Sequence, residues 1–226
     1  MNNKKTIVLD LDETVIFTTQ EKEDNVSYDL EFTIDTNFKE EFFYTTYRPH
    51  LKKFIKYIEA NFNIIVWTSS TSDYAKIIVD NIFNKKDIIV LAREFYPYQK
   101  RITPALVEDL EYAPTFVHNI IKAQRYWNDL KKIDLRFISS EISLYTKPLK
   151  KLIKNYPQYN IKDIICIDND PYKFYQNFGN YWFIKDFKGN KDDDYLLKFI
   201  NLLEKIKDYS DVREIKKESF KPLILE

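Results

Sequence analysis

Short apolar runs alternate with helical patterns along most of the chain. Five runs are rich in Ile, Val and aromatic residues, as buried strands are, and they occupy residues 7–11, 63–70, 87–92, 163–169 and 181–187. Between them, apolar residues recur every three or four positions, which indicates amphipathic helices. Strands that alternate with helices predict an α/β fold, a Rossmann-like parallel sheet with helices on both faces.

The predicted helices supply the crossover connections that parallel strands require. Residues 49–62 form a helix that opens with a proline, which fits the first turn. Residues 72–82 form a helix that opens with a serine cap. Pro148 begins another helix, and residues 196–206 carry the last apolar stripe.

A β-hairpin is predicted after the first strand. Residues 26–35 alternate strictly between apolar and polar side chains, which is typical of a half-buried strand. A polar turn separates them from a second strand at 42–47, and this spacing indicates antiparallel pairing. We expect the hairpin to be an insertion at about 24–47.

A second insertion is predicted to be helical. Residues 97–146 carry apolar positions at spacings of three and four. The tail at 208–226 is charged and weakly patterned. We therefore expect a single domain over residues 1–207 that carries both insertions.

Charge and composition exclude several classes of protein. Lysine plus arginine equals aspartate plus glutamate at 35 each, which argues against a general binder of nucleic acid or of a membrane surface. No apolar stretch approaches the ~20 residues that span a bilayer, and the chain does not open with a signal-peptide pattern. Cys166 is the only cysteine, which excludes an internal disulfide and a cysteine metal cluster. We expect an intracellular protein, cytoplasmic or nuclear, without direct contact to a membrane or nucleic acid.

Polar side chains stand at the ends of three predicted strands. They are Asp10 with Asp12, Thr68 with Ser69, and Asp168 with Asn169. Ligands bind beyond the carboxyl ends of parallel strands, so these groups are expected to converge on one crevice. Carboxylates gathered there repel one another unless a cation lies among them, and Mg²⁺ prefers oxygen ligands and a substrate phosphate. With hydroxyls at a helix start and a lysine on the rim, the pattern indicates phosphoryl transfer.

Two acids spaced two residues apart can divide the work of hydrolysis. One carboxylate attacks phosphorus, while the other protonates the leaving oxygen and later takes a proton from water. Different surroundings set the two pKa values apart. The pattern therefore predicts separate roles for Asp10 and Asp12.

Several motifs follow one another in a fixed order, each at a strand end or a helix start. They are DLDETVI (10–16), YRPH (47–50), VWTSSTSDYAKIIVD (66–80), AREF (92–95), YTKPLKKL (145–152), ICIDNDP (165–171) and FIKDFKGNKDDDYLLKFINLLEKI (183–206). In this order they resemble the haloacid dehalogenase superfamily, and within it the FCP/SCP-like, or NLI-interacting-factor-like, phosphatases of the carboxy-terminal domain of RNA polymerase II. The resemblance implies that superfamily's fold and a Mg²⁺-dependent phosphatase of phosphoserine and phosphothreonine in a protein substrate.

The resemblance also implies catalytic roles for particular residues. Asp10 is the nucleophile that becomes an aspartyl phosphate, and Asp12 is the general acid and base. Thr68 binds a phosphoryl oxygen, with Ser69 beside it as a substrate-binding residue. Lys147 neutralises the charge that develops on the phosphoryl group.

The metal and substrate residues are carried over in the same way. Asp168 and Asn169 hold Mg²⁺ directly or through water. Asp10 and the main-chain carbonyl of Asp12 also face the metal. Arg93 matches the arginine of the family's Arg-Glu pair and is expected to contact substrate.

The chain departs from the family pattern at two motif positions. His50 stands where the family usually has glycine, and Pro148 stands where an aspartate usually follows the lysine. The second departure leaves Lys150 and Lys151 as alternatives to Lys147. The long connection at 97–146 leaves the identity of the substrate open, because substrates are selected on that side of the crevice.

Two other functions remain open from the sequence. One is a small-molecule phosphatase of the same superfamily, in which residues 97–146 form a lid over the substrate. The other is a non-catalytic binding module, because the resemblance includes a mitochondrial import receptor of this fold that often lacks the catalytic acids. Both Asp10 and Asp12 are present in this chain.

Overall fold

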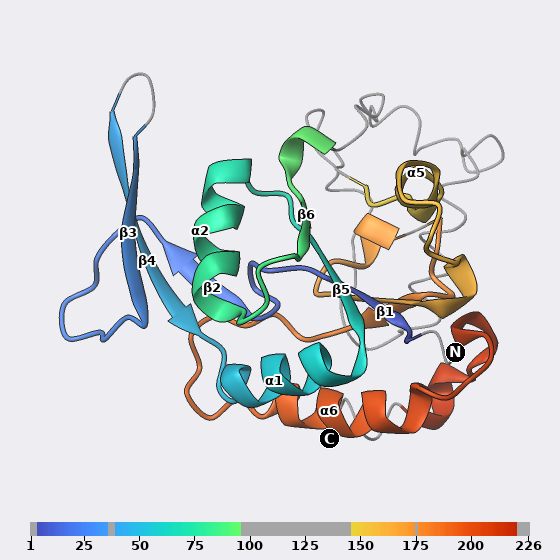
Figure 1. Ribbon diagram of the computed structural model, residues 1–226. Helices are drawn as coiled ribbons and strands as arrows, with labels where there is room; N and C mark the ends of the chain where they lie inside the picture. Colours follow the sequence, from blue (N-terminus) through green and yellow to red (C-terminus); the bar gives the residue numbers. More distant parts are fainter. Residues whose placement is uncertain (1–3, 36–38, 96–145, 175, 221–226) are drawn as a thin grey trace, which may run out of the picture.

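The computed structural model describes residues 4–35, 39–95, 146–174 and 176–220 (Figure 1). The helical insertion predicted at 97–146 lies outside these ranges except for its last residue. Within them, the chain forms a parallel sheet flanked by helices, and a smaller antiparallel sheet stands to one side (Figure 1). The predicted α/β class is confirmed.

The main sheet has five parallel strands in the order β6-β5-β1-β7-β8. Their bounds are β1 (Thr6–Leu9), β5 (Asn63–Trp67), β6 (Ile89–Leu91), β7 (Ile164–Asp168) and β8 (Tyr181–Phe183). All five were predicted from their apolar runs, although β8 is shorter than the run at 181–187. The central strands β1 and β7 are buried along their whole length, because helices cover both faces of the sheet.

The strand order reverses beside β1, and this reversal positions the candidate site. The chain adds β5 and β6 on one side of β1 and β7 and β8 on the other. Leu9 pairs with Val66 on one neighbour and with Ile167 on the other. The residues that follow these three positions therefore leave the sheet at the same height, at the edge where parallel sheets bind ligands.

Four described α-helices flank the sheet: α1 (Leu51–Asn61), α2 (Ser72–Ile82), α5 (Leu149–Asn155) and α6 (Tyr195–Ile206). Helix α1 packs against both α2 and α6, and α5 lies across the sheet from them (Figure 1). No helix in the described ranges combines the length and the apolar character needed to cross a membrane.

Two predicted helix starts are shifted in the structure. Pro49 was expected in the first turn, but His50, in a left-handed conformation with φ 66°, occupies the cap and α1 begins at Leu51. Ser72 was expected to be a cap, but Thr71 holds that position and Ser72 is the first helical residue. The Ser72 hydroxyl instead donates to Glu94 at 2.7 Å, a long-range partner that local pattern does not reveal.

The smaller sheet has the order β2-β4-β3, with β2 (Ile16–Thr19), β3 (Leu30–Asp35) and β4 (Glu40–Tyr47). The predicted pairing of the two hairpin strands is confirmed, with Phe32 opposite Phe43. Strand β2 was not predicted, because it begins on the last residue of the first motif and its four residues show no strict alternation. It pairs with β4 and so joins the hairpin to the loop after β1.

The chain after α6 packs back against the core. Val212 is completely buried and Ile215 nearly so. Lys217 is also buried, and its ammonium donates to the main-chain oxygens of Phe178 and Gly179 at 2.8 and 2.6 Å. The apolar residues that make these contacts are few and lie in or next to short 3-10 turns. Their hydrophobic pattern along the sequence is therefore weak.

A buried ion pair ties the end of the hairpin to the segment before α6. Arg48 is completely buried, and its guanidinium donates to both carboxylate oxygens of Asp193 at 2.7 and 2.8 Å. A third bond runs to the main-chain oxygen of Thr14 at 2.7 Å. The rings of Phe187 and Tyr195 lie 5.5 and 5.1 Å from the guanidinium carbon.

Arg48→Lys is expected to lower the free energy of unfolding by about 2 kcal/mol. A lysine keeps the charge but cannot supply the fork to Asp193 together with the bond to Thr14, so a buried acceptor loses its donor. Arg213→Lys is the matched control, since Arg213 also pairs with an aspartate but is exposed, and there we expect less than about 1 kcal/mol. Urea denaturation measures both, and equal losses would contradict the role given to Arg48.

Candidate active site

The loop after β1 is a tight turn that fixes the first aspartate. Leu11 accepts main-chain bonds from residues 14, 15 and 16, and Glu13 adopts a left-handed conformation with φ 57°. The main-chain N–H of Asp10 donates to Ile167 on β7 at 3.0 Å. The hydroxyl of Thr14 lies 3.1 Å from Oδ2 of Asp10, so that the turn itself orients this carboxylate.

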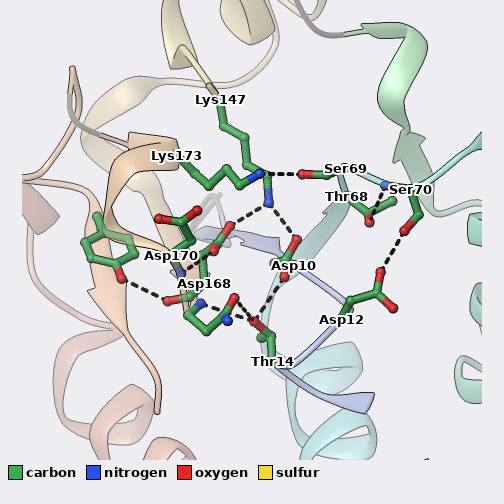
Figure 2. Close-up of polar contacts among 12 residues, drawn as sticks. Asp10, Asp12, Thr14, Thr68, Ser69, Ser70, Lys147, Asp168, Asp170 and Lys173 are labelled. Carbon is green, nitrogen blue, oxygen red and sulfur yellow. Dashed lines mark hydrogen bonds and ion pairs between the residues drawn. The ribbon is translucent and has the colours of Figure 1, made fainter. Parts of the chain in front are cut away.

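Lys147 bridges the carboxylates that follow β1 and end β7 (Figure 2). Its ammonium lies 2.7 Å from Oδ1 of Asp10 and 2.5 Å from Oδ2 of Asp168. Lys147 is 0% exposed, Asp168 1% and Asp10 7%. A lysine on the rim was expected, but the structure places it between the acids, where two buried like charges most need a cation.

The two alternative lysines lie elsewhere. Lys150 is exposed on α5. Lys151 donates to the main-chain oxygen of Phe95 and lies 4.4 Å from the centre of its ring. Of the three candidates from the sequence, the structure therefore brings Lys147 to the strand ends.

One lysine does not fully balance two buried carboxylates. Burial raises the pKa of Asp168, the negative charge of Asp10 raises it further, and Lys147 opposes both effects. Oδ1 of Asp168 accepts from the main-chain N–H of Asp170 at 2.7 Å, so both of its oxygens have donors. The pair carries surplus negative charge, which suits a site for a further cation.

The carboxylate of Asp12 points away from this bridge (Figure 2). Oδ2 accepts from the hydroxyl of Ser70 at 2.8 Å, and Oδ1 accepts from the hydroxyl of Tyr74 at 2.5 Å. Burial raises the pKa of Asp12, while the bonds from Tyr74 and Ser70 oppose the rise. The two aspartates of the motif therefore lie in different surroundings, as the sequence predicts.

Asp12 lines a pocket of about 360 Å³ between the hairpin sheet and α2. The hydroxyl of Tyr74 also lies 2.7 Å from that of Thr18, which lies 2.9 Å from that of Thr45. A chain of hydroxyls thus connects the strands β2 and β4 to the Asp12 carboxylate. Phe43 and Arg93 also line this pocket.

Two hydroxyl residues, Thr68 and Ser69, follow β5 and therefore lie across β1 from Asp168. Thr68 is completely buried, and its hydroxyl oxygen accepts from the main-chain N–H of Ser70 at 3.1 Å. The hydroxyl of Ser69 accepts from the ammonium of Lys173 at 2.6 Å. Arg93 is exposed, and its Nε donates to the main-chain oxygen of Ser69 at 2.8 Å. The structure thus brings all the predicted site residues to one end of the sheet.

Oxygen atoms around Thr14 fit a magnesium ion. The Thr14 hydroxyl lies near both Oδ2 of Asp10 and Oδ1 of Asn169, at 3.1 and 3.4 Å, but its single proton satisfies only one of them. The amide nitrogen of Asn169 donates to Glu13 and Asp186, which leaves the amide oxygen facing the Thr14 hydroxyl. Two hard oxygen donors therefore converge with unfilled acceptor capacity, as Mg²⁺ requires.

The described residues do not provide a cluster of acidic side chains for the metal. In the ranges that the structure describes, no three histidine, cysteine, aspartate or glutamate residues gather around one point as metal ligands do. The carboxylates of Asp168 and Asp12 are held by other partners. A metal role for Asp12 would therefore fall to its main-chain carbonyl, in the way that the resemblance implies.

Two contacts in the site were not predicted from the sequence. Tyr74 was assigned only to the apolar face of its helix, which hides the bond from its hydroxyl to Asp12. Lys173 was not singled out, although it follows Asn169 by four residues in a short 3-10 turn, η4 (Pro171–Phe174). The available signal was a lysine two residues after the ICIDNDP motif (165–171).

Comparison with known proteins finds two viral relatives of this chain. A CTD phosphatase-like protein of Invertebrate iridescent virus 3 is 36% identical over 85 residues, which cover 35% of this chain and 45% of that protein. Its counterpart in Invertebrate iridescent virus 6 is 34% identical over 86 residues, with 37% and 47% covered. The chain thus spans about half the length of the curated relatives it matches.

The same likeness extends to a solved structure and to a family model. The structure of Fcp1, an essential RNA polymerase II CTD phosphatase, matches with a TM-score of 0.51 at 15% identity, over 92% of this chain and 51% of Fcp1, which shows a shared fold. The sequence model of the NLI interacting factor-like phosphatases matches residues 5–213. The chain therefore belongs to the NLI interacting factor-like phosphatase family.

Proposed function

We propose that the protein is a Mg²⁺-dependent phosphatase that hydrolyses phosphoserine and phosphothreonine in a protein substrate through an aspartyl phosphate. The observation that carries this proposal is the contrast between the two motif aspartates. Asp10 is held by a buried lysine and a threonine hydroxyl, whereas Asp12 is turned toward a separate pocket. These are the surroundings that a nucleophile and a general acid need.

The reaction has two steps. A carboxylate oxygen of Asp10 attacks phosphorus, the bond from phosphorus to the serine oxygen breaks, and Asp12 gives its proton to that oxygen. A water molecule then attacks the phosphorus of the aspartyl phosphate and gives a proton to Asp12. The bond from phosphorus to Asp10 breaks, and inorganic phosphate leaves with both aspartates restored.

The remaining residues stabilise charge. Lys147 neutralises charge on the phosphoryl oxygens, and Thr68 and Ser69 bind those oxygens. Bound Mg²⁺ would supply further positive charge next to the phosphoryl group. We assign Asn169 to the metal and Asp168 to the positioning of Lys147. One Asp168 oxygen pairs with Lys147 and the other accepts from the main-chain N–H of Asp170, whereas Oδ2 of Asp10 and Oδ1 of Asn169 share the single proton of Thr14.

The proposed substrate is a phosphoprotein. Family membership supports this class, and the carboxy-terminal domain of RNA polymerase II is a candidate because Fcp1 acts on it. The small-molecule alternative depends on residues 97–146 as a lid, and all of these except the last lie outside the described residues. The binding-module alternative is disfavoured because Asp10 and Lys147 form an intact pair.

Phosphate release from phosphoserine peptides and from a panel of sugar and nucleotide phosphates, with Mg²⁺ or EDTA, tests this proposal. We expect the peptides to be preferred and EDTA to abolish turnover. Preference for a small molecule would support the lid alternative, and full activity in EDTA would contradict the metal site. Folded, Mg²⁺-loaded protein that releases phosphate from none of them would indicate a binding module.

Tyr74→Phe is expected to lower kcat on a phosphoserine peptide by about tenfold, because a misplaced general acid loses part of a contribution of 10² to 10⁴. The loss on p-nitrophenyl phosphate should be smaller, since nitrophenolate leaves without a proton. Tyr28→Phe is the control, because the Tyr28 hydroxyl accepts from the main-chain N–H of Glu23 in the exposed segment before β3. Equal losses on the two substrates would contradict a role of Tyr74 in positioning the acid.

A further inference from the structure

Two cationic side chains lie at the rim of the site and share one serine. Lys173 donates to the Ser69 hydroxyl at 2.6 Å, and Nε of Arg93 donates to the Ser69 main-chain oxygen at 2.8 Å. The two positive groups are thus separated by little more than this one residue. They come from opposite sides of the crevice, Lys173 from η4 after β7 and Arg93 from η1 (Arg93–Phe95) after β6.

Exposure increases outward from the reacting carboxylate. Lys147 is completely buried, Lys173 is half-buried and Arg93 is exposed. Lys147 therefore lies at the reacting carboxylate, whereas Lys173 and Arg93 are nearer to solvent. The main-chain N–H of Lys147 donates to the main-chain oxygen of Lys173 at 2.6 Å, which fixes the outer cation relative to the inner one.

The charges at the rim suit an anion beyond the reacting phosphate. The carboxylates of Asp10, Asp12 and Asp168 repel an approaching anionic chain, and cations at the entrance offset this repulsion. A lysine is a compact donor with three N–H groups, and an arginine binds phosphate or carboxylate through two parallel bonds. Two such groups around one serine form a site for a second acidic group.

We propose, on the basis of the phosphatase function proposed above, that Lys173 and Arg93 bind a second phosphate of the substrate protein while its neighbouring phosphoserine lies against Asp10. The site would select multiply phosphorylated peptides. Arg93 also lines the pocket that contains Asp12, so the peptide would cross Ser69 as it leaves the reacting centre.

The test compares peptides with one phosphoserine and peptides that carry a second one, placed two or three residues to either side. For the wild-type protein with Mg²⁺, we expect kcat/KM to be about tenfold higher for at least one doubly phosphorylated peptide. Lys173→Met and Arg93→Gln should each bring this ratio close to one. Lys173→Arg should restore most of it, and Lys53→Met, an exposed lysine of α1, should leave it intact.

The outcomes separate the two proposals. If both peptides lose activity equally in Lys173→Met, the lysine only holds the Ser69 loop and the second-phosphate site is overturned. If the wild-type protein hydrolyses the peptides without preference, this inference fails and the phosphatase function stands. If it hydrolyses no phosphopeptide, both fail. Thermal unfolding of each variant confirms that the ratios come from folded protein.

Discussion

Replacing Asp10 with asparagine is expected to lower phosphate release from p-nitrophenyl phosphate by about 10⁴-fold or more, because the variant lacks the attacking carboxylate and removal of a nucleophile has effects of this size. The fold should survive, since Lys147 keeps its partner Asp168 and the buried group loses surplus negative charge. Steady-state kinetics with Mg²⁺ measures the loss.

Asp35→Asn is the control, because Asp35 is an exposed aspartate at the end of β3, away from the site. It should retain wild-type turnover. Asp10→Asn protein that melts at the wild-type temperature or above it and is inactive would support a chemical role. Substantial activity in folded Asp10→Asn would contradict the account.

Lys147→Met is expected to lower the free energy of unfolding by about 3 to 5 kcal/mol, because it leaves two buried carboxylates without their cation. Activity should also be lost. Adding Asp168→Asn to this variant should recover much of the stability, since one of the two uncompensated charges is then removed. Lys53→Met on α1 should change stability little. Urea denaturation at fixed pH measures all four proteins.

The loss in Lys147→Met should depend on pH. Burial and a neighbouring carboxylate raise the pKa of Asp168 in the folded protein, and loss of Lys147 raises it further. The folded variant then binds protons that the unfolded chain has released, so its free energy of unfolding falls as pH rises. The deficit relative to wild type should be smaller at pH 5 than at pH 8. A stability deficit that does not change with pH would contradict the buried arrangement of Lys147 between Asp10 and Asp168.

The main sheet was predictable from sequence because its strands are buried on both faces. A run such as Ile164–Asp168 is apolar up to its last residue, where polar residues begin, and helical spacing separates it from the preceding run. The parallel arrangement then places Asp10, Thr68 and Asp168 at one edge of the sheet. The candidate site follows from topology before any side-chain contact is known.

The details that sequence did not give depend on contacts between distant residues. The motif resemblance assigned Lys147 and left Lys150 and Lys151 as alternatives, and only the fold shows Lys147 between two carboxylates. The bond from the Tyr74 hydroxyl to Asp12 could not be predicted, because the helical pattern counts tyrosine as an apolar residue. Strand β2 is too short to carry a period and forms because β4 is there to pair with it.

The covalent intermediate is the most direct test of the account. Asp12→Asn mixed with p-nitrophenyl phosphate and Mg²⁺ should still form the aspartyl phosphate, because nitrophenolate needs no proton, but should hydrolyse it slowly for want of a base. After acid quenching and digestion, mass spectrometry should find phosphate on the peptide that contains Asp10, and none when Asp10→Asn is added. Nitrophenolate release without protein-bound phosphate, or phosphate on another residue, would contradict Asp10 as the nucleophile.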